Sequence, residues 1–125
     1  MDSKKLKMLC LHGQNGDKNL MEYQIRHLKA CFSQVMEFTT IDGTYDCPQD
    51  PPASLAKFLV DGRTNFREWL KLPFFSPKEG VPDKSAYGLE DSVTYLKQIL
   101  SSNQYDGVIA FSQGGIFYRH FWRIT

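Results

Sequence analysis

The chain has 125 residues, with 15 basic and 14 acidic side chains and a hydrophobic fraction of 42%. This composition is typical of one compact globular domain, and a formal charge of +1 gives no reason to expect nucleic acid, a membrane surface or an acidic substrate as partner. The first apolar run, residues 8–11, is shorter than the ~7–15-residue core of a signal peptide and the ~20 residues of a membrane span.

The three cysteines are Cys10, Cys31 and Cys47, an odd number with no C-x-x-C spacing. Two of them lie in apolar stretches, where a cysteine behaves as a small hydrophobic residue. This usage favours a reducing compartment, so we expect a cytoplasmic protein that holds no metal and no cofactor.

The first third of the chain reads as strand, helix, strand. Residues 6–11 form a short apolar run that predicts a central strand buried on both faces of a parallel sheet. A helix follows, with Asp17 or Asn19 as its expected cap, and residues 35–41 are rich in β-branched and aromatic side chains, which favours a second strand. The apolar stripe of the helix comprises Met21, Ile25, Leu28 and Phe32.

Residues 44–85 are divided by prolines and predict an ordered but irregular excursion. Residues 89–100 then repeat the spacing of an amphipathic helix, and residues 107–111 form a third apolar strand. The expected fold class is therefore α/β, with a mostly parallel, Rossmann-like sheet between two helical layers. We expect these elements to form an incomplete three-layer fold.

The third strand runs directly into Ser112-Gln113-Gly114-Gly115. A strand that feeds a sharp turn of small residues is the setting of a nucleophile elbow, in which a serine in a strained conformation is presented at the strand end. Ala110 stands where the first glycine of G-x-S-x-G is usual, and Gly114 keeps the second. The competing interpretation is an ordinary S-x-G turn.

The first strand ends in His12-Gly13-Gln14. In hydrolases of this type one oxyanion donor is the backbone N–H that follows the nucleophile, here Gln113, and the other lies in a loop after an earlier strand, here Gln14. We expect His12 to hold this loop through a side-chain hydrogen bond. Alternatively, the loop is a glycine-rich turn that binds an anion or a nucleotide, with Asp42 as ligand, although its glycine spacing fits neither common motif.

Four short segments of the chain carry a family resemblance, namely Leu9-Cys10-Leu11-His12-Gly13, Gly88-Leu89-Glu90-Asp91-Ser92, Tyr105-Asp106-Gly107 and Phe111-Ser112-Gln113-Gly114-Gly115. Together they resemble the FSH serine hydrolases, which are small α/β-hydrolases with carboxylesterase activity. The resemblance implies a small ester substrate, Ser112 as nucleophile, and an oxyanion loop at His12, Gly13 and Gln14. It also extends to Trp69, which precedes the second helix as the family's tryptophan does.

The acid and base of a catalytic triad are expected after the serine in this fold. Residues 114–125 contain no acidic side chain, and His120 lies eight residues beyond Ser112, or ~12 Å along a helix axis. We therefore expect residues 1–125 to be the N-terminal part of an FSH domain, with Ser112 weakly activated. The alternative is a non-catalytic interaction module that self-associates through its uncovered sheet.

Overall fold

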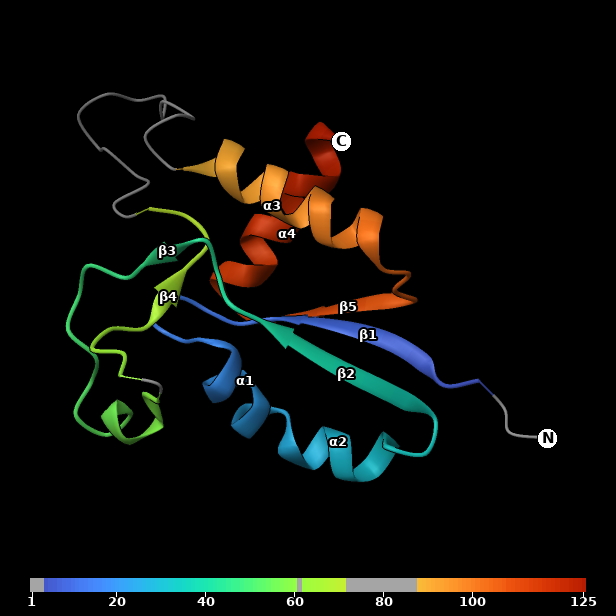
Figure 1. The fold of residues 1–125 in the computed structure, drawn as a ribbon, viewed down its shortest axis with the longest axis horizontal. Coiled ribbons are helices and arrows are strands. Elements are labelled where there is room, and N and C mark those ends of the chain that lie inside the picture. The colour runs from blue at the N-terminus through green and yellow to red at the C-terminus, as the bar shows by residue number, and fades with distance from the viewer. Residues whose placement is uncertain (1–3, 61, 72–87) are drawn as a thin grey trace.

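The computed structural model describes residues 4–60, 62–71 and 88–125 (Figure 1). Its main sheet has three strands in the order β2 (Met36–Ile41), β1 (Leu6–Leu11) and β5 (Gly107–Ala110). Both pairings are parallel, so the three carboxyl ends lie at one edge of the sheet. The first strand is central, as predicted.

The sheet lies between two layers of helices (Figure 1). Helices α1 (Lys18–Gln24) and α2 (Arg26–Phe32) cover one face, and α3 (Leu89–Ser102) and α4 (Gln113–Ile124) cover the other. This mixed α/β architecture confirms the predicted fold class and is that of a partial α/β-hydrolase.

Strand β1 is buried only over its second half, which corrects the prediction of burial along its whole length. Leu9, Cys10 and Leu11 have no exposed surface, whereas Leu6 is 47% exposed. The reason lies in the register, because pairing with β5 begins only at Met8. The first residues of β1 therefore extend past their neighbour.

The first helical segment is kinked where a single helix was predicted. Ile25 has φ −95° and ψ 9°, and it separates α1 from α2. The helical pattern of backbone hydrogen bonds continues across Ile25. Its N–H donates to Met21 O at 2.9 Å, and its own oxygen accepts from Lys29 N at 2.8 Å. The kink turns the end of the predicted stripe outward, and Phe32 is 42% exposed.

The excursion contains more regular structure than the sequence suggested. Strands β3 (Tyr45–Asp46) and β4 (Arg67–Glu68) pair antiparallel, and a 3-10 turn, η1 (Ala56–Phe58), lies between them. An isolated bridge joins Arg67 to Gly16, which fastens this pair beside the carboxyl edge of the main sheet. The rest of the predicted excursion, residues 72–85, falls outside the described residues.

The larger core cluster fills the space between the sheet and the α3/α4 layer. Trp69, which has no exposed surface, lies in this cluster although it belongs to no long element. The buried members are Leu9, Leu11, Trp69, Leu70, Leu89, Val93, Leu96, Phe117 and Phe121. A smaller cluster of Cys10, Met21 and Ile25 lies under the opposite face.

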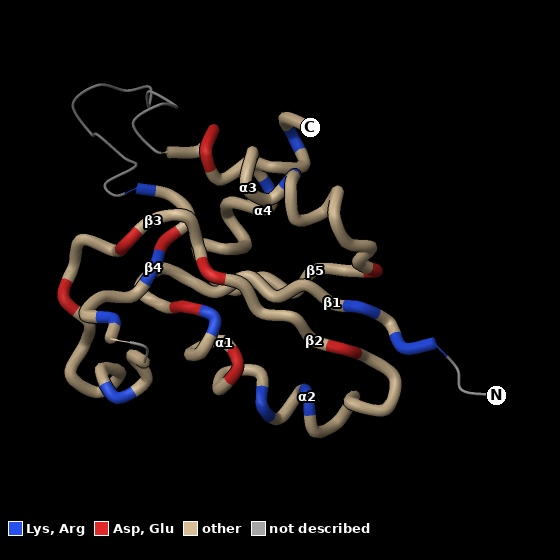
Figure 2. Tube along the Cα trace, in the orientation of Figure 1, with Lys and Arg blue, Asp and Glu red and all other residues tan. Residues whose placement is uncertain are grey.

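Charged residues of both signs are distributed over both helical layers and the sheet (Figure 2). Within the part of the chain that the structure describes, no helix combines the length and the apolarity that a bilayer crossing requires.

Candidate active site

Ser112 occupies the junction between β5 and α4, where the sequence predicted an elbow. Its φ of 53° and ψ of −117° are unusual for a residue with a side chain, and it is the N-cap of α4. A conformation of this kind costs on the order of 1–3 kcal/mol and persists only when the surrounding structure enforces it. The serine is exposed, so the strain presents its hydroxyl to solvent.

Two glycines allow the backbones around Ser112 to approach closely. A Cβ on Gly114 would lie 2.5 Å from the oxygen of His12 and 2.8 Å from that of Leu11. A Cβ on Gly13 would lie 3.2 Å from the Cβ of Ser112. The His12-Gly13 loop and the elbow are therefore in direct contact. Position 114 requires the absence of a side chain, and position 13 is tightly packed.

His12 is completely buried and uses both ring nitrogens. Nδ1 donates to the oxygen of Gly13 at 2.6 Å, and Nε2 accepts from the N–H of Gly43 at 2.8 Å. The imidazole thus ties the loop after β1 to the loop after β2. This is the structural side-chain role that the sequence suggested for His12.

Trp69 connects the His12 loop to the excursion. Its indole N–H donates to the oxygen of His12 at 2.9 Å, and its ring stacks on Phe117 of α4 with centroids 5.2 Å apart and planes 8° from parallel. From the sequence, Trp69 was expected to show that the irregular segment packs on something, and it was also noted as a family feature. Its aromatic character in a proline-rich segment was the one signal that it packs in the core.

The side chain of Gln113 also binds the Trp69-Leu70 segment. Its Oε1 accepts from the N–H of Trp69 at 2.8 Å and of Leu70 at 3.3 Å, and its Nε2 donates to Leu70 O at 3.0 Å. The residue after the serine was predicted to act through its backbone alone. In the structure its amide also binds a segment more than forty residues away in the sequence.

The G-L-E-D-S segment completes this network. The hydroxyl of Ser92 donates to the oxygen of Trp69 at 2.6 Å and therefore accepts from the hydroxyl of Thr44, also at 2.6 Å. Gly88 precedes α3 with a φ of 69°, and its oxygen accepts from Tyr45 Oη at 2.7 Å. The motif residues thus position the Trp69 segment.

The two expected oxyanion donors flank the elbow on different loops. Within the described residues, neither the backbone N–H of Gln14 nor that of Gln113 has a hydrogen-bond acceptor. Gln113 is the first residue of α4, so its N–H is one of the free donors at a helix N-terminus. Both amides therefore have no partner among the described residues.

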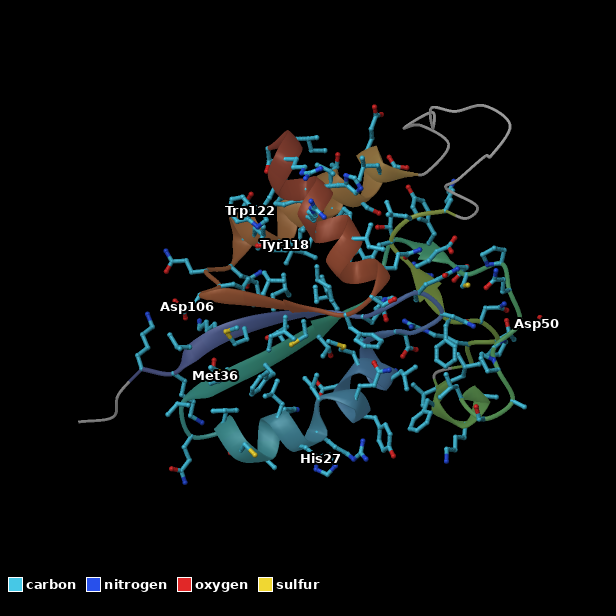
Figure 3. The ribbon with its side chains drawn as sticks, turned by 180° about the vertical axis from the view of Figure 1, so that it is seen from behind. His27, Met36, Asp50, Asp106, Tyr118 and Trp122 are labelled. Atoms are coloured by element: carbon cyan, nitrogen blue, oxygen red, sulfur yellow. The ribbon has the colours of Figure 1, made fainter. Side chains whose placement is uncertain are left out.

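None of the chain's three histidines is bonded to Ser112 among the described residues. His12 is committed to Gly13 and Gly43. His27 lies on α2, on the opposite side of the sheet from Tyr118 and Trp122 of α4 (Figure 3), and His120 is exposed two turns along α4. The described residues contain the serine and its setting without a base in contact with it.

The alternative of a nucleotide site receives no support at Asp42. Its carboxylate is paired with the Arg63 guanidinium at 2.5 Å and accepts from the N–H of Lys18 at 3.0 Å. Burial is the largest single influence and raises the pKa of Asp42. The hydrogen bonds from Arg63 and from the N–H of Lys18, together with the positive charges of both residues, lower it more, so the pKa lies below its usual range. Asp42 thus fastens the excursion and is not open to a ribose.

Across the described ranges, no three His, Cys, Asp or Glu side chains are grouped as metal ligands would be.

The parallel sheet, the two helical layers and the strained serine between β5 and α4 define a partial α/β-hydrolase fold with a nucleophile-elbow geometry. Comparison with protein families agrees with this class, because the serine hydrolase (FSH1) family matches residues 1–121. The chain therefore belongs to the FSH1 serine hydrolase family. It matches none of the curated proteins with which it was compared.

Proposed function

We propose that the chain carries the nucleophile and oxyanion half of a carboxylesterase that acts on small esters through an acyl-Ser112 intermediate. The observation that supports this most directly is the strained, exposed Ser112, with Gly13 packed against its Cβ. In the proposal, the Ser112 hydroxyl works together with the backbone amides of Gln14 and Gln113. That arrangement suits attack on a carbonyl carbon.

In the proposed reaction, Oγ of Ser112 attacks the ester carbonyl, and the carbonyl oxygen becomes an oxyanion. The N–H groups of Gln14 and Gln113 donate to that oxyanion, and the N-terminus of α4 adds favourable electrostatic potential. The tetrahedral intermediate then expels the alcohol and leaves an acyl-serine, which water hydrolyses to the acid.

Attack also requires an acceptor for the proton of Ser112. A general base must lie within ~2.6–3.2 Å of that proton's oxygen, and the described residues place no histidine there. We therefore propose that this chain is a slow esterase by itself. Its rate should reflect oxyanion stabilisation and binding, which provide only ~10³–10⁴-fold over water when triad residues are lost.

A fluorophosphonate probe tests this assignment. We expect slow labelling that peptide mass spectrometry locates on Ser112, and slow hydrolysis of p-nitrophenyl acetate. Ser112→Ala should abolish both signals. Ser101→Ala is the matched control, because the hydroxyl of Ser101 is exposed and bonds only within α3, to Lys97 O.

Labelling that survives Ser112→Ala, or that is located on another residue, would refute the proposal. Joining the acid- and histidine-bearing segment of another family member to this chain should raise both rates. Fast labelling of the chain alone would show instead that a base from a second subunit reaches Ser112.

A second candidate is a non-catalytic module that associates with its own copies. Strand β5 is an edge strand of the sheet and carries no charge, and Phe111 and Trp122 near it are 55% and 64% exposed. Sedimentation velocity over a concentration series would detect the association. Trp122→Lys should weaken it, whereas Val35→Lys, at an exposed position at the other end of the sheet, should not.

We also propose a reducing, cytoplasmic setting for the enzyme. All three cysteines are free thiols in the structure, and Cys31 is exposed. We propose that the chain binds a small-molecule ester and has neither nucleic acid nor a membrane as partner.

A further inference from the structure

The hydrogen bonds of His12 determine its protonation state. The oxygen of Gly13 can only accept, so Nδ1 must carry a proton. The N–H of Gly43 can only donate, so Nε2 must be unprotonated. The ring is therefore the neutral Nδ1–H tautomer, and the bond to Gly43 exists only in that form.

Both bonds lie in a closed environment. His12 has no exposed surface, and its ring lies 5.4 Å from that of Trp69. The surroundings of Gly43 are crowded, because a Cβ there would lie 2.8 Å from the backbone oxygen of Glu68 and 3.1 Å from His12 Nε2. An additional proton on Nε2 would have no room and no acceptor.

Three charged side chains, those of Asp42, Asp17 and Arg67, act on this imidazole from the packed elements. Burial lowers the pKa of His12, and this effect outweighs the favourable influence of the Asp42 and Asp17 carboxylates. The positive charge of the Arg67 guanidinium also lowers the pKa of His12. The backbone oxygen of Glu68 lies next to the Gly43 position. The Glu68 side chain is buried, and burial raises the pKa of its carboxyl group.

We infer that His12 is an acid-sensitive positioning residue, which ties the Gly13-Gln14 loop to the Gly43 segment after β2 while neutral and loses that tie when protonated. Protonation turns the Nε2 acceptor into a donor that faces the N–H of Gly43, so the bond between the two loops is replaced by a repulsive contact. The loop then loses its attachment to the segment after β2. Only the consequence for catalysis rests on the proposed function, because the switch itself depends on His12 geometry.

The direction of the pH effect follows from linkage. A histidine whose pKa is lower in the folded state binds fewer protons folded than unfolded. Its contribution to stability is therefore fully present above the unfolded pKa of about 6.5 and is lost as the pH falls from there toward the folded pKa. The loop should loosen on the acid side.

Nitrogen-15 NMR tests the inference on the chain with His27→Asn and His120→Asn, which leaves His12 as its only imidazole. We expect a protonated Nδ1 and an unprotonated Nε2 at pH 7.5. We also expect a midpoint of titration below that of the same chain unfolded in urea. On acidification the amide signals of Gly13, Gln14 and Gly43 should shift together with the ring. An Nε2–H tautomer, or a midpoint at or above that of the unfolded chain, would overturn the inference.

A second measurement separates the switch from catalysis. The urea midpoint of the wild-type chain should fall between pH 7.5 and pH 5.5, and His12→Asn should reduce this fall, whereas His27→Asn should not. These results do not depend on ester hydrolysis. Loss of fluorophosphonate labelling at every pH with the NMR result intact would reject the esterase and keep the switch.

Discussion

The indole N–H of Trp69 donates to the backbone oxygen of His12 at 2.9 Å, across 57 positions of the sequence. His12 immediately precedes the loop that contacts Ser112, and Gln113 immediately follows the serine and binds the backbone of Trp69. The Trp69 segment is therefore a bridge between the two loops that form the candidate site.

Trp69→Phe should destabilise the chain although the ring stacking on Phe117 is largely preserved. The substitution leaves the oxygen of His12 without its donor in a buried position, which costs about 1–3 kcal/mol before any loss of packing. Trp122→Phe is the control, because Trp122 is 64% exposed. Urea unfolding followed by circular dichroism measures both, and equal midpoints for the two variants would contradict the bridging role.

Gly114→Ala and Gly115→Ala should have opposite effects although they are neighbours on α4. At position 114 the new methyl would meet two backbone oxygens within 2.8 Å, so the elbow must move, at a cost of at least about 1–3 kcal/mol. At position 115 the nearest atom lies 3.8 Å away, and alanine favours the helix by up to ~1 kcal/mol over glycine. Thermal unfolding of both variants tests this, and a tolerated Gly114→Ala would rule out the close approach of the β1 loop.

Ser92→Ala should cost about 1–3 kcal/mol, because it leaves Trp69 O and the Thr44 hydroxyl without their partner in the interior. Ser102→Ala is a suitable control, since that exposed hydroxyl bonds only to Gln98 O in the same helix. The free energies of unfolding of the two variants should differ by at least about 1 kcal/mol. If they agree, the Ser92 hydroxyl does not hold the Trp69 segment.

Thiol reactivity should distinguish the three cysteines. Burial raises the pKa of Cys10 to about 11 and also raises that of Cys47, whereas Cys31 is exposed. In the folded chain, a disulfide reagent such as 5,5′-dithiobis(2-nitrobenzoic acid) at pH 8 should therefore modify Cys31 first and the other two only on unfolding. Rapid reaction of all three would indicate a loosely packed state, which self-association through β5 would not explain.

Much of the fold is encoded in local patterns. The spacing of Leu89, Val93 and Leu96 predicted α3, and the apolar runs predicted the three parallel strands, because helices and strands bury side chains with different periods. The sharp turn from β5 into α4 was also predictable, since it needs small residues close to Ser112. The kink at Ile25 was not, because the apolar spacing continues through it unchanged.

The connections within the site were decided by tertiary packing. Nothing in the residues around Gln113 indicates that its amide binds Trp69 and Leu70, and nothing near His12 indicates Gly43 as its partner. A buried polar side chain takes whichever complementary group the fold brings to it, and the nearest neighbours in sequence do not specify that group. The sequence alone therefore determined which residue types stand at the elbow and the oxyanion loop, whereas only the folded arrangement of the Trp69 segment decided how the two loops are held together.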